Sequence, residues 1–416
     1  MKKIRNIKGT KDLLPDETFI WQKLEEKIHH FNQQFGYKEI RTPAFEESDL
    51  FKRGVGSETD IVNKEMYSWI DQGGNNLTLK PELTAPVTRA YIQHELGKSN
   101  PINKLYYIDA LFRRERPQKG RFRQFEQFGI EAIGSDHPEQ DVEVISMAYY
   151  FYEKIGIENL RLKINSIGSQ ETRKTYKKAL HKFLLDSKES LSDVSKKRLS
   201  TNPMRILDTK IDFEIEIIKN APKIIDFLSP QDKEHFDTIL NYLDQLNIKY
   251  EIDHLLVRGL DYYSRTVFEI QSDLLGAQSA LCGGGRYDYL IEELGGKSTP
   301  AIGFAAGFER LIIVLNKALN ISNNNPDIYI VSMGLKSIEY AVKLAQKLRF
   351  KNNLIVVTDT LRQSLKAQMK EANKLKAHHT IIIGDDEIDK KKLIIKNMDS
   401  GNQDEIDFEK VESYFK

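Results

Sequence analysis

The chain has 416 residues, and its 62 lysines and arginines against 61 aspartates and glutamates leave a formal net charge of +1. This length predicts two or three domains, and the balanced charge means that any nucleic-acid-binding surface has to be local. A single cysteine, Cys282, excludes an internal disulfide and a cysteine-based zinc site, and residues 1 to 20 contain no apolar signal core, so we expect a cytoplasmic protein that does not bind a membrane.

The first predicted element is a helix near Thr18 to Phe35, where apolar residues recur at helical spacing and Gly36 follows. From there to about Ile167, short apolar segments such as KEIRTPAF, EMYSWI, NNLTLKPE and NKLYYIDALFR are separated by Gly, Pro and Asn, which is typical of strands and turns. TAPVTRAYIQHEL stands among them as a helix. This part predicts a largely antiparallel sheet with inserted helices.

Residues 170 to 250 are rich in charged residues at helical spacing, and strand-like sequence returns in HLLVRGLDYYSRTVFEIQS and AIGFAAGFERLI. NISNNNP, residues 320 to 326, is a candidate linker. Beyond it, DIYIVSM, a helix around Ile338 to Leu348, NLIVVTD, a helix around Leu361 to Leu375, and TIIIGDD predict a small parallel or mixed sheet with helices on its faces. The expected fold class is α+β, with a core in two parts (1–169 and 251–319), a mostly helical insertion (170–250) and an α/β domain (326–416).

The stretch LFRRERPQKGRFRQFEQFGIE, residues 111 to 131, combines arginines with phenylalanines. We expect a hairpin with FRRER on the first strand, PQKGR as the loop and FRQFEQFGIE on the second strand. Strand alternation places Phe125, Gln127 and Glu131 on one face unless a bulge at Gly129 changes the phase. A planar base could then stack on Phe125 while neighbouring arginines meet phosphate oxygens. On its own, an arginine-rich stretch of this kind is more often a solvated hairpin held by ion pairs, so a binding role needs further motifs.

Two further stretches offer polar groups for a pocket. In LKPELTAPVTRAY, Glu82 and Thr84 follow a strand and suit an α-ammonium group, although a helix capped near Thr84 explains them as well. In LVRGLDYYSRTVFEI, the permanently charged Arg258 precedes Tyr262 and Tyr263. Buried tyrosines usually belong to the core, so the nearby arginine is what favours a site.

Glycines mark the remaining candidates. In AIGFAAGFERLI, Gly303 and Gly307 allow close approach of a ligand or of another backbone, and the helix that follows carries Arg310. CGGGRYD lacks the spacing of a phosphate-binding loop, which favours a glycine-rich turn beside a pocket. The two histidine pairs, at 29–30 and 378–379, have no partners at metal-ligand spacing.

Several of these motifs, in this order, resemble the class II aminoacyl-tRNA synthetases and, among them, the histidyl-tRNA synthetases. FRRERPQKGRFRQFEQFGIE looks like motif 2 and GFAAGFER like motif 3 of that class. LVRGLDYYSRTVFE and AQSALCGGGRYD look like the two histidine signatures, and IKGTKDLLP looks like the N-terminal opening of the family. The resemblance covers essentially the whole chain.

The resemblance implies ATP-dependent activation of L-histidine to histidyl-adenylate with release of pyrophosphate, and then transfer of the histidyl group to the 3′ end of tRNA(His). It also implies Mg²⁺ with the ATP, a homodimer and an anticodon-binding domain from about residue 326, with no side chain acting as a resident metal ligand. Arg113 and Arg258 would be catalytic. The residues implied to bind histidine are Glu82, Thr84, Arg113, Gln127, Glu131, Arg258, Tyr262 and Tyr263, and those implied to bind ATP are Arg113, Glu115, Arg121, Phe125 and Arg310.

Two positions depart from the family pattern. Lys80 stands where arginine is more usual, and Glu126 stands where histidine is common. Neither position is among those assigned to the substrates, so the departures bear on the fine tuning of the site and leave the expected activity unchanged. Two rival functions remain: a non-catalytic, synthetase-like regulatory subunit of ATP phosphoribosyltransferase, and a class II synthetase for another amino acid such as proline or threonine.

Overall fold

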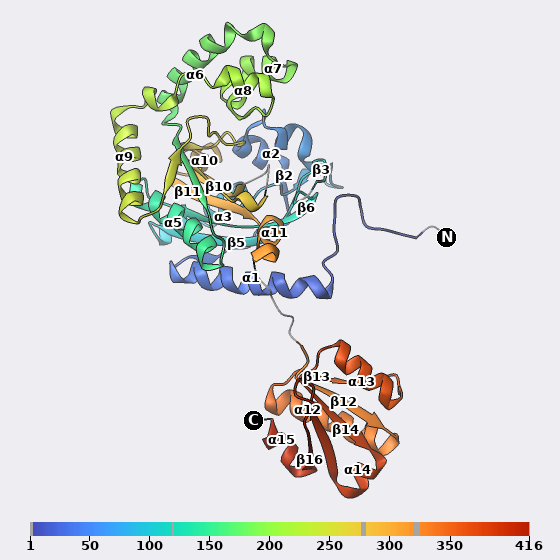
Figure 1. Cartoon of the computed structure of the whole chain (residues 1–416). Helices are drawn as coiled ribbons and strands as arrows, with labels where there is room; N and C mark the ends of the chain where they lie inside the picture. Colours follow the sequence, from blue (N-terminus) through green and yellow to red (C-terminus); the bar gives the residue numbers. More distant parts are fainter. Residues whose placement is uncertain (1–2, 119, 276–279, 319–324, 416) are drawn as a thin grey trace. The chain divides into compact units, whose positions relative to one another are not determined.

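The computed structural model of the chain describes residues 3–118, 120–275, 280–318 and 325–415 (Figure 1). Packing divides the chain into two units, Met1–Ile321 and Ser322–Lys416, which are treated separately below. Most of the predicted linker, residues 320 to 324, lies outside the described residues. Within the described ranges, no helix combines the length and the apolar character that crossing a membrane requires.

An antiparallel sheet forms the centre of the first unit, as the sequence predicts. Only the two edge pairs of this sheet are parallel among the described strands, β1 with β5 and β7 with β8. The eight described strands follow the spatial order β1 (Lys38–Glu39), β5 (Asn103–Phe112), β6 (Gln124–Ile133), β11 (Ala301–Gly307), β10 (Ala280–Arg286), β9 (Ser264–Gln271), β7 (Arg161–Ser166) and β8 (Tyr250–Ile252).

Helices α1 (Pro15–Gln34), α5 (Pro138–Lys154) and α11 (Phe308–Ala318) cover one face of this sheet, and α9 (Pro230–Gln245) packs beside α5 (Figure 1). The N-terminal helix predicted near Thr18 to Phe35 is therefore present. Its apolar residues, such as Trp21 and Leu24, are buried against the sheet, and the Trp21 ring stacks on Phe308 with ring centroids 5.1 Å apart. Burial of this apolar stripe is what holds an otherwise polar helix in place.

The other face of the sheet carries the elements that build a pocket. Helices α3 (Thr84–Gln93) and α10 (Leu290–Glu293) pack there together with the first part of the predicted helical insertion. A small sheet stands beside them, with the strand order β2 (Phe45–Glu47), β4 (Asn76–Leu79), β3 (Tyr67–Ile70). Helix α2 (Ser48–Phe51) and two π-helical turns, Lys52–Gly56 and Ile61–Glu65, connect β2 to β3, and α4 (Leu96–Ser99) follows α3 in the sequence. On this face the insertion contributes α6 (Gln170–Leu185), α7 (Asp193–Thr201), the 3-10 turn Pro203–Asp208 and α8 (Asp212–Ile218). Its last helix, α9, is the one that packs beside α5 on the opposite face.

Two expectations about strands are wrong. CGGGR is not a turn, because these residues form β10 in the middle of the sheet. A side chain on Gly284 would lie 2.2 Å from the carbonyl oxygen of Gly303 on the adjacent strand, so the glycines permit close packing where we expected a turn. FRRER is not a strand either, since β5 ends at Phe112 and the backbone of Arg114 turns away to donate to Glu65 at 2.7 Å.

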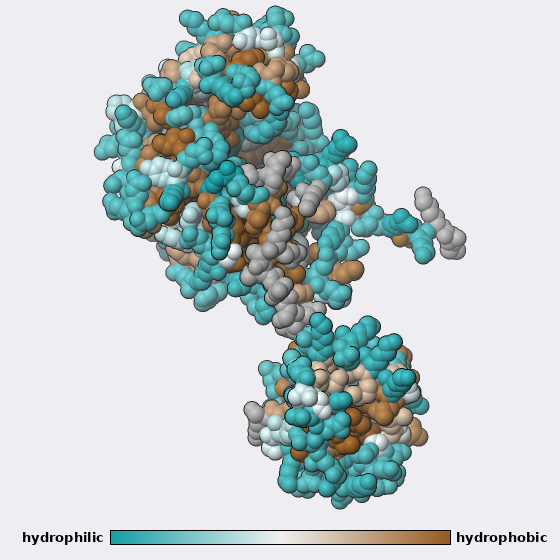
Figure 2. Space-filling model, in the orientation of Figure 1, coloured by the Kyte–Doolittle hydropathy of each residue, from teal (hydrophilic) through white to brown (hydrophobic). Residues whose placement is uncertain are grey.

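The second unit is a mixed sheet with helices on both faces, as predicted. Strands β12 (Ile328–Met333), β13 (Val356–Thr358) and β14 (His379–Gly384) are parallel. Two antiparallel strands that were not predicted, β15 (Lys392–Asn397) and β16 (Gln403–Asp407), complete the sheet. Hydrophilic residues cover most of the visible face of this unit (Figure 2). Its helices are α12 (Leu335–Asn352), α13 (Leu365–Lys374), α14 (Asp385–Lys390) and α15 (Val411–Tyr414).

Candidate active site

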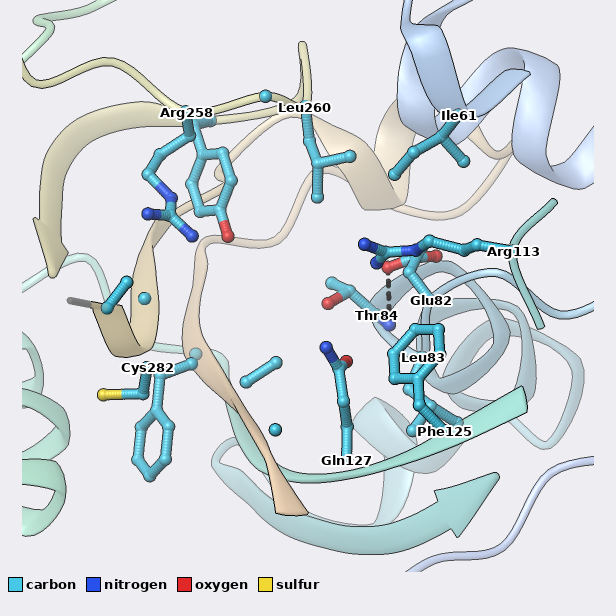
Figure 3. A pocket seen from close by; sticks show the side chains of 18 of the residues that line it. Ile61, Glu82, Leu83, Thr84, Arg113, Phe125, Gln127, Arg258, Leu260 and Cys282 are labelled. Atoms are coloured by element: carbon cyan, nitrogen blue, oxygen red, sulfur yellow. Dashed lines mark hydrogen bonds between the residues drawn. The ribbon is translucent and has the colours of Figure 1, made fainter. Parts of the chain in front are cut away.

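A cavity of about 380 Å³ opens on the face of the large sheet that carries α3 and the insertion. Strand β6 enters it with Phe125, Gln127 and Glu131, the residues expected on one face, and the pairing of β6 with β5 passes through Gly129 without a bulge. Figure 3 shows side chains converging on this space from several segments. Every predicted site residue lines the cavity: Glu82, Thr84, Arg113, Glu115, Arg121, Phe125, Gln127, Glu131, Arg258, Tyr262, Tyr263 and Arg310.

Arginines give part of the cavity a positive character. The Arg113 Nε donates to the carbonyl oxygen of Pro81 at 2.8 Å, and its guanidinium lies 5.2 Å from the centroid of the Phe125 ring. Arg121 pairs with Glu115 at 3.3 Å, and Arg310 donates to the carbonyl oxygen of Ala280 at 2.9 Å. Arginine remains charged in proteins, so fixed guanidinium groups around an aromatic ring suit a ligand with a planar base and phosphates.

Glu82 lies just before α3 and lines the cavity. Its carboxylate accepts hydrogen bonds from the backbone N–H groups of Thr84 and Ala85, each at 2.9 Å. Burial raises the pKa of Glu82, and those two N–H groups act against the rise. The start of α3 is therefore capped, as the alternative interpretation expected, and the capping carboxylate also lines the cavity.

Glu131 lies at the centre of a ring of hydroxyl groups. Thr84 Oγ1 donates to its Oε1 at 2.8 Å, the Tyr107 hydroxyl donates to Oε1 at 3.2 Å, and the Tyr287 hydroxyl donates to Oε2 at 2.5 Å. Burial raises the pKa of Glu131 to about 8, although the hydroxyls work in the opposite direction. Room for the carboxyl comes from Gly303, since a Cβ there would lie 2.0 Å from Oε2. The arrangement gives the cavity a buried, hydrogen-bonding acid.

Arg258 stands on the opposite side of the cavity from Arg113 (Figure 3). Its Nη1 donates to Glu269 at 2.9 Å, while its Nε is buried with no hydrogen-bond partner among the described residues. Gly283 on β10 leaves room for the guanidinium, because a Cβ there would lie 2.2 Å from Nη2. A half-buried, fixed cation with an unused donor fits an anionic ligand.

Several residues of the site were not predicted from the sequence. Tyr107 and Tyr287 hold Glu131, and Glu269 and Gly283 hold Arg258. Tyr287 lies within the quoted motif AQSALCGGGRYD, so a signal was available for it. The cavity is also lined by residues of the insertion, namely Arg198, Arg205 and Asp208.

The two departures from the family pattern lie outside the cavity lining. Lys80 is buried, and its Nζ contacts Asp109 at 2.5 Å and the carbonyl oxygen of Thr42 at 3.1 Å. Burial raises the pKa of Glu126 to about 7, with Glu25 and Asp109 adding to the rise. The buried contact between Lys80 and Asp109 shows that the lysine still forms the structural ion pair at this position.

No cluster of three or more histidine, cysteine or acidic side chains with metal-binding geometry occurs in the described part of the chain. Of the paired histidines, His29 Nδ1 lies 2.9 Å from the Tyr106 hydroxyl, and His379 Nε2 lies 3.4 Å from the side-chain nitrogen of Asn397. Both contacts are ordinary polar packing.

Comparison with known proteins identifies the family. A sequence model described as "Histidyl-tRNA synthetase" matches residues 9–311, and one described as "Anticodon binding domain" matches residues 327–416. The chain is 46% identical over 411 residues to a histidine–tRNA ligase of Clostridium botulinum (strain 657 / Type Ba4), covering 98% of each chain. It is 47% identical over 412 residues to that of Thermoanaerobacter sp. (strain X514), again covering 98% of each. The crystal structure of apo S. aureus histidyl-tRNA synthetase matches with a TM-score of 0.84 at 39% identity, covering 99% of this chain and 100% of that chain. The chain belongs to the histidyl-tRNA synthetase family.

Proposed function

We propose that the cavity activates L-histidine with ATP and passes the histidyl group to the 3′ end of tRNA(His). The observation that carries this proposal is the buried Glu131 carboxyl, held by three hydroxyls in the same cavity as the arginines. A site that pairs a buried acid with a ring N–H rejects amino acids without one, because the acid would be left unpaired. A proline or threonine enzyme has no use for that acid, and the full-length relatives do not favour the regulatory-subunit alternative.

Three groups of residues bind different parts of the histidine substrate. Glu82, Thr84 and Gln127 receive the α-ammonium group, for which carboxylate, hydroxyl and amide oxygens are suitable acceptors. Glu131 and Tyr263 contact the imidazole, with Tyr262 packed against Tyr263 at a ring-centroid distance of 4.6 Å. Arg258 and Arg113 bind the substrate carboxylate and the α-phosphate from opposite sides, so these two arginines are the catalytic residues.

ATP occupies the arginine-rich part of the cavity. Phe125 stacks under the adenine, and Arg121 and Arg310 bind the outer phosphates. In the first step a carboxylate oxygen of histidine attacks the α-phosphorus, the bond to the bridging oxygen breaks, and pyrophosphate leaves. In the second step a ribose hydroxyl of tRNA attacks the acyl carbon and AMP leaves. Neither step needs a nucleophile from the protein, so positioning and fixed positive charge supply the catalysis.

Mg²⁺ is expected with the ATP, because it binds phosphate oxygens and water together with one or two carboxylates. Glu115, which lines the cavity beside Arg121, is a carboxylate in a suitable place. The ion would supply further positive charge to the phosphates.

The remaining parts of the proposal concern the whole chain. We propose that residues 1–169 and 251–319 form the catalytic core around the insertion at 170–250, and that residues 326–416 bind the anticodon, as the match to an anticodon-binding model suggests. The exposed apolar residues Phe45, Trp69 and Ile70 on the small sheet are suited to contact a second copy, which supports a homodimer. A cytoplasmic location follows from the substrates.

Pyrophosphate exchange into ATP tests the reaction. Purified protein is incubated with each standard amino acid in turn, and only histidine is expected to support exchange. Discrimination against amino acids without a ring N–H is expected to reach about 10⁴-fold. Exchange driven equally well by proline or threonine would contradict the substrate assignment, and no exchange with any amino acid would favour the regulatory-subunit alternative.

A further inference from the structure

The loop of residues 259–263 depends on the helical insertion for its conformation. It follows Arg258 directly, and Leu260, Tyr262 and Tyr263 line the cavity. These residues lie in neither a helix nor a strand, so the loop lacks a backbone ladder of its own. Its conformation is therefore set by the segments packed around it.

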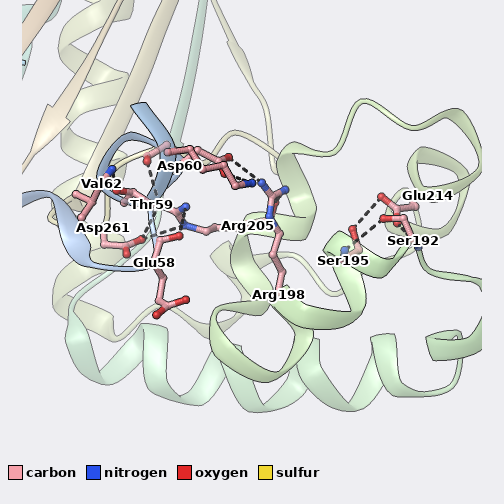
Figure 4. A network of polar contacts seen from close by, with 12 residues as sticks. Glu58, Thr59, Asp60, Val62, Ser192, Ser195, Arg198, Arg205, Glu214 and Asp261 are labelled. Carbon is pink, nitrogen blue, oxygen red and sulfur yellow. Dashed lines mark hydrogen bonds and ion pairs between the residues drawn. The ribbon is translucent and has the colours of Figure 1, made fainter. Parts of the chain in front are cut away.

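Arg205, in the 3-10 turn Pro203–Asp208 of the insertion, holds the first part of this loop (Figure 4). Its Nη2 donates to the carbonyl oxygen of Gly259 at 3.0 Å, and its Nε donates to Asp261 Oδ1 at 3.3 Å. Its Nη1 donates to the carbonyl oxygen of Glu58 at 3.1 Å, and the side chain is only 11% exposed. One planar guanidinium thus joins three segments that are far apart in the sequence.

Further contacts fix the loop, among them a hydrogen bond from Asn202 Nδ2 to Asp261 Oδ1 at 3.1 Å. Arg173, on α6 of the insertion, donates to the carbonyl oxygen of Tyr263 at 2.7 Å. On the opposite side, Gly56 has a φ of +101°, and a Cβ there would lie 2.5 Å from Asp261 Oδ2. The backbone N–H of Asp261 donates to the carbonyl oxygen of Val55 at 3.1 Å. The loop is therefore clamped between the insertion and the π-helical turn Lys52–Gly56.

We propose that Arg205, assisted by Arg173, is a positioning residue for histidine activation. It holds residues 259–263 in the conformation in which Arg258, Tyr262 and Tyr263 face the substrate. The insertion thereby sets the fraction of molecules whose active site is competent, although it contributes none of the proposed catalytic residues. This inference rests on the proposed function and adds to it a role for the insertion in the first chemical step.

The experiment compares Arg205→Ala, Arg205→Lys and the wild type in histidine-dependent pyrophosphate exchange. In Arg205→Ala the released loop should displace the guanidinium of Arg258 from its position against the substrate. A displacement of about 1 Å is expected to lower kcat by about 10-fold to 100-fold. The KM for histidine should rise, because the loop carries histidine-binding residues. The KM for ATP should change less than the KM for histidine, since Arg121, Phe125 and Arg310 lie outside the loop and keep their contacts with the nucleotide. Lysine retains the charge facing Asp261 but cannot reach both carbonyls, so Arg205→Lys should give an intermediate kcat.

Arg161→Ala is the matched control, because it removes an arginine–aspartate pair, Arg161 with Asp273 at 2.5 Å, that does not line the cavity. Equal kinetic constants for Arg205→Ala and Arg161→Ala would overturn the inference, as would a fall in kcat that only matches the loss of folded protein by circular dichroism. Should Arg205→Ala fail to fold, Arg205→Lys decides: an intermediate kcat with a raised histidine KM supports the proposal, and wild-type constants overturn it. A wild type that does not exchange with histidine would refute the proposed function instead.

Discussion

Replacing Glu131 with glutamine is expected to stabilise the protein at neutral and alkaline pH. Burial raises the pKa of this carboxyl from 4.5 to about 8. The unfolded chain releases the proton near its ordinary pKa, whereas the folded chain keeps it until the pH approaches 8. The stability that the proton supplies is fully present below the unfolded pKa and is lost as the pH rises through the folded pKa.

The size of the effect on the free energy of unfolding follows from the pH range between the unfolded and the folded pKa of Glu131. Each pH unit within it changes the free energy of unfolding by about 1.4 kcal/mol, so the wild type should lose about 4 kcal/mol between about pH 5 and about pH 8. Glutamine has nearly the same shape and does not titrate. It lacks one acceptor for the hydroxyls of Thr84, Tyr107 and Tyr287, which costs about 1–3 kcal/mol at every pH. The variant should therefore be close to the wild type or less stable at the lower pH, and more stable at the higher pH.

Urea unfolding followed by tryptophan fluorescence measures this difference. The chain has 2 tryptophans, Trp21 and Trp69, and both belong to the unit Met1–Ile321, so the signal reports on the unit that contains Glu131. Glu234→Gln, which removes an exposed carboxylate, is the matched control for the loss of one negative charge. A free-energy difference between Glu131→Gln and the wild type that stays constant from about pH 5 to about pH 8 would refute the reasoning. We also expect the more stable variant to be less active with histidine, because functional sites trade stability for activity.

Three further predictions concern the reaction. Arg258→Ala should lower the single-turnover rate of adenylation by about 10² to 10³ and weaken histidine binding much less; an unchanged rate with a raised histidine requirement would make Arg258 a substrate anchor only. Gly283→Ala should reduce the same rate by about 10-fold or more, because the new Cβ would meet the guanidinium of Arg258; a rate equal to that of the wild type would show that this glycine is dispensable. Removing residues 322–416 should leave histidine-dependent pyrophosphate exchange intact and impair tRNA charging, because no proposed active-site residue lies in that unit and distant tRNA contacts position the acceptor end; loss of both activities in a sample that circular dichroism shows to be folded would contradict this division.

Local sequence determined the elements and the identity of the chemical groups. A period of two on β6 places Phe125, Gln127 and Glu131 on one face, and this face became one wall of the cavity. Helical spacing of apolar residues predicted α1, and the alternation of strand and helix predicted the mixed sheet of the second unit. Such features depend on residues a few positions apart, so they can be read along the chain.

Contacts between distant segments were decided only by the tertiary structure. Tyr107 and Tyr287 surround Glu131 because strand register and the Gly303 backbone bring them together, and no local pattern encodes that register. CGGGR looks like a turn in isolation, yet it forms a central strand between β11 and β9. Its glycines are needed because Cβ atoms there would collide with the adjacent strands and with Arg258. The hold of Arg205 on the loop after Arg258 joins residues more than fifty positions apart. The charge state of Glu131 also follows from burial by segments far away in the sequence, because desolvation depends on everything packed around the group and not on its neighbours in the chain.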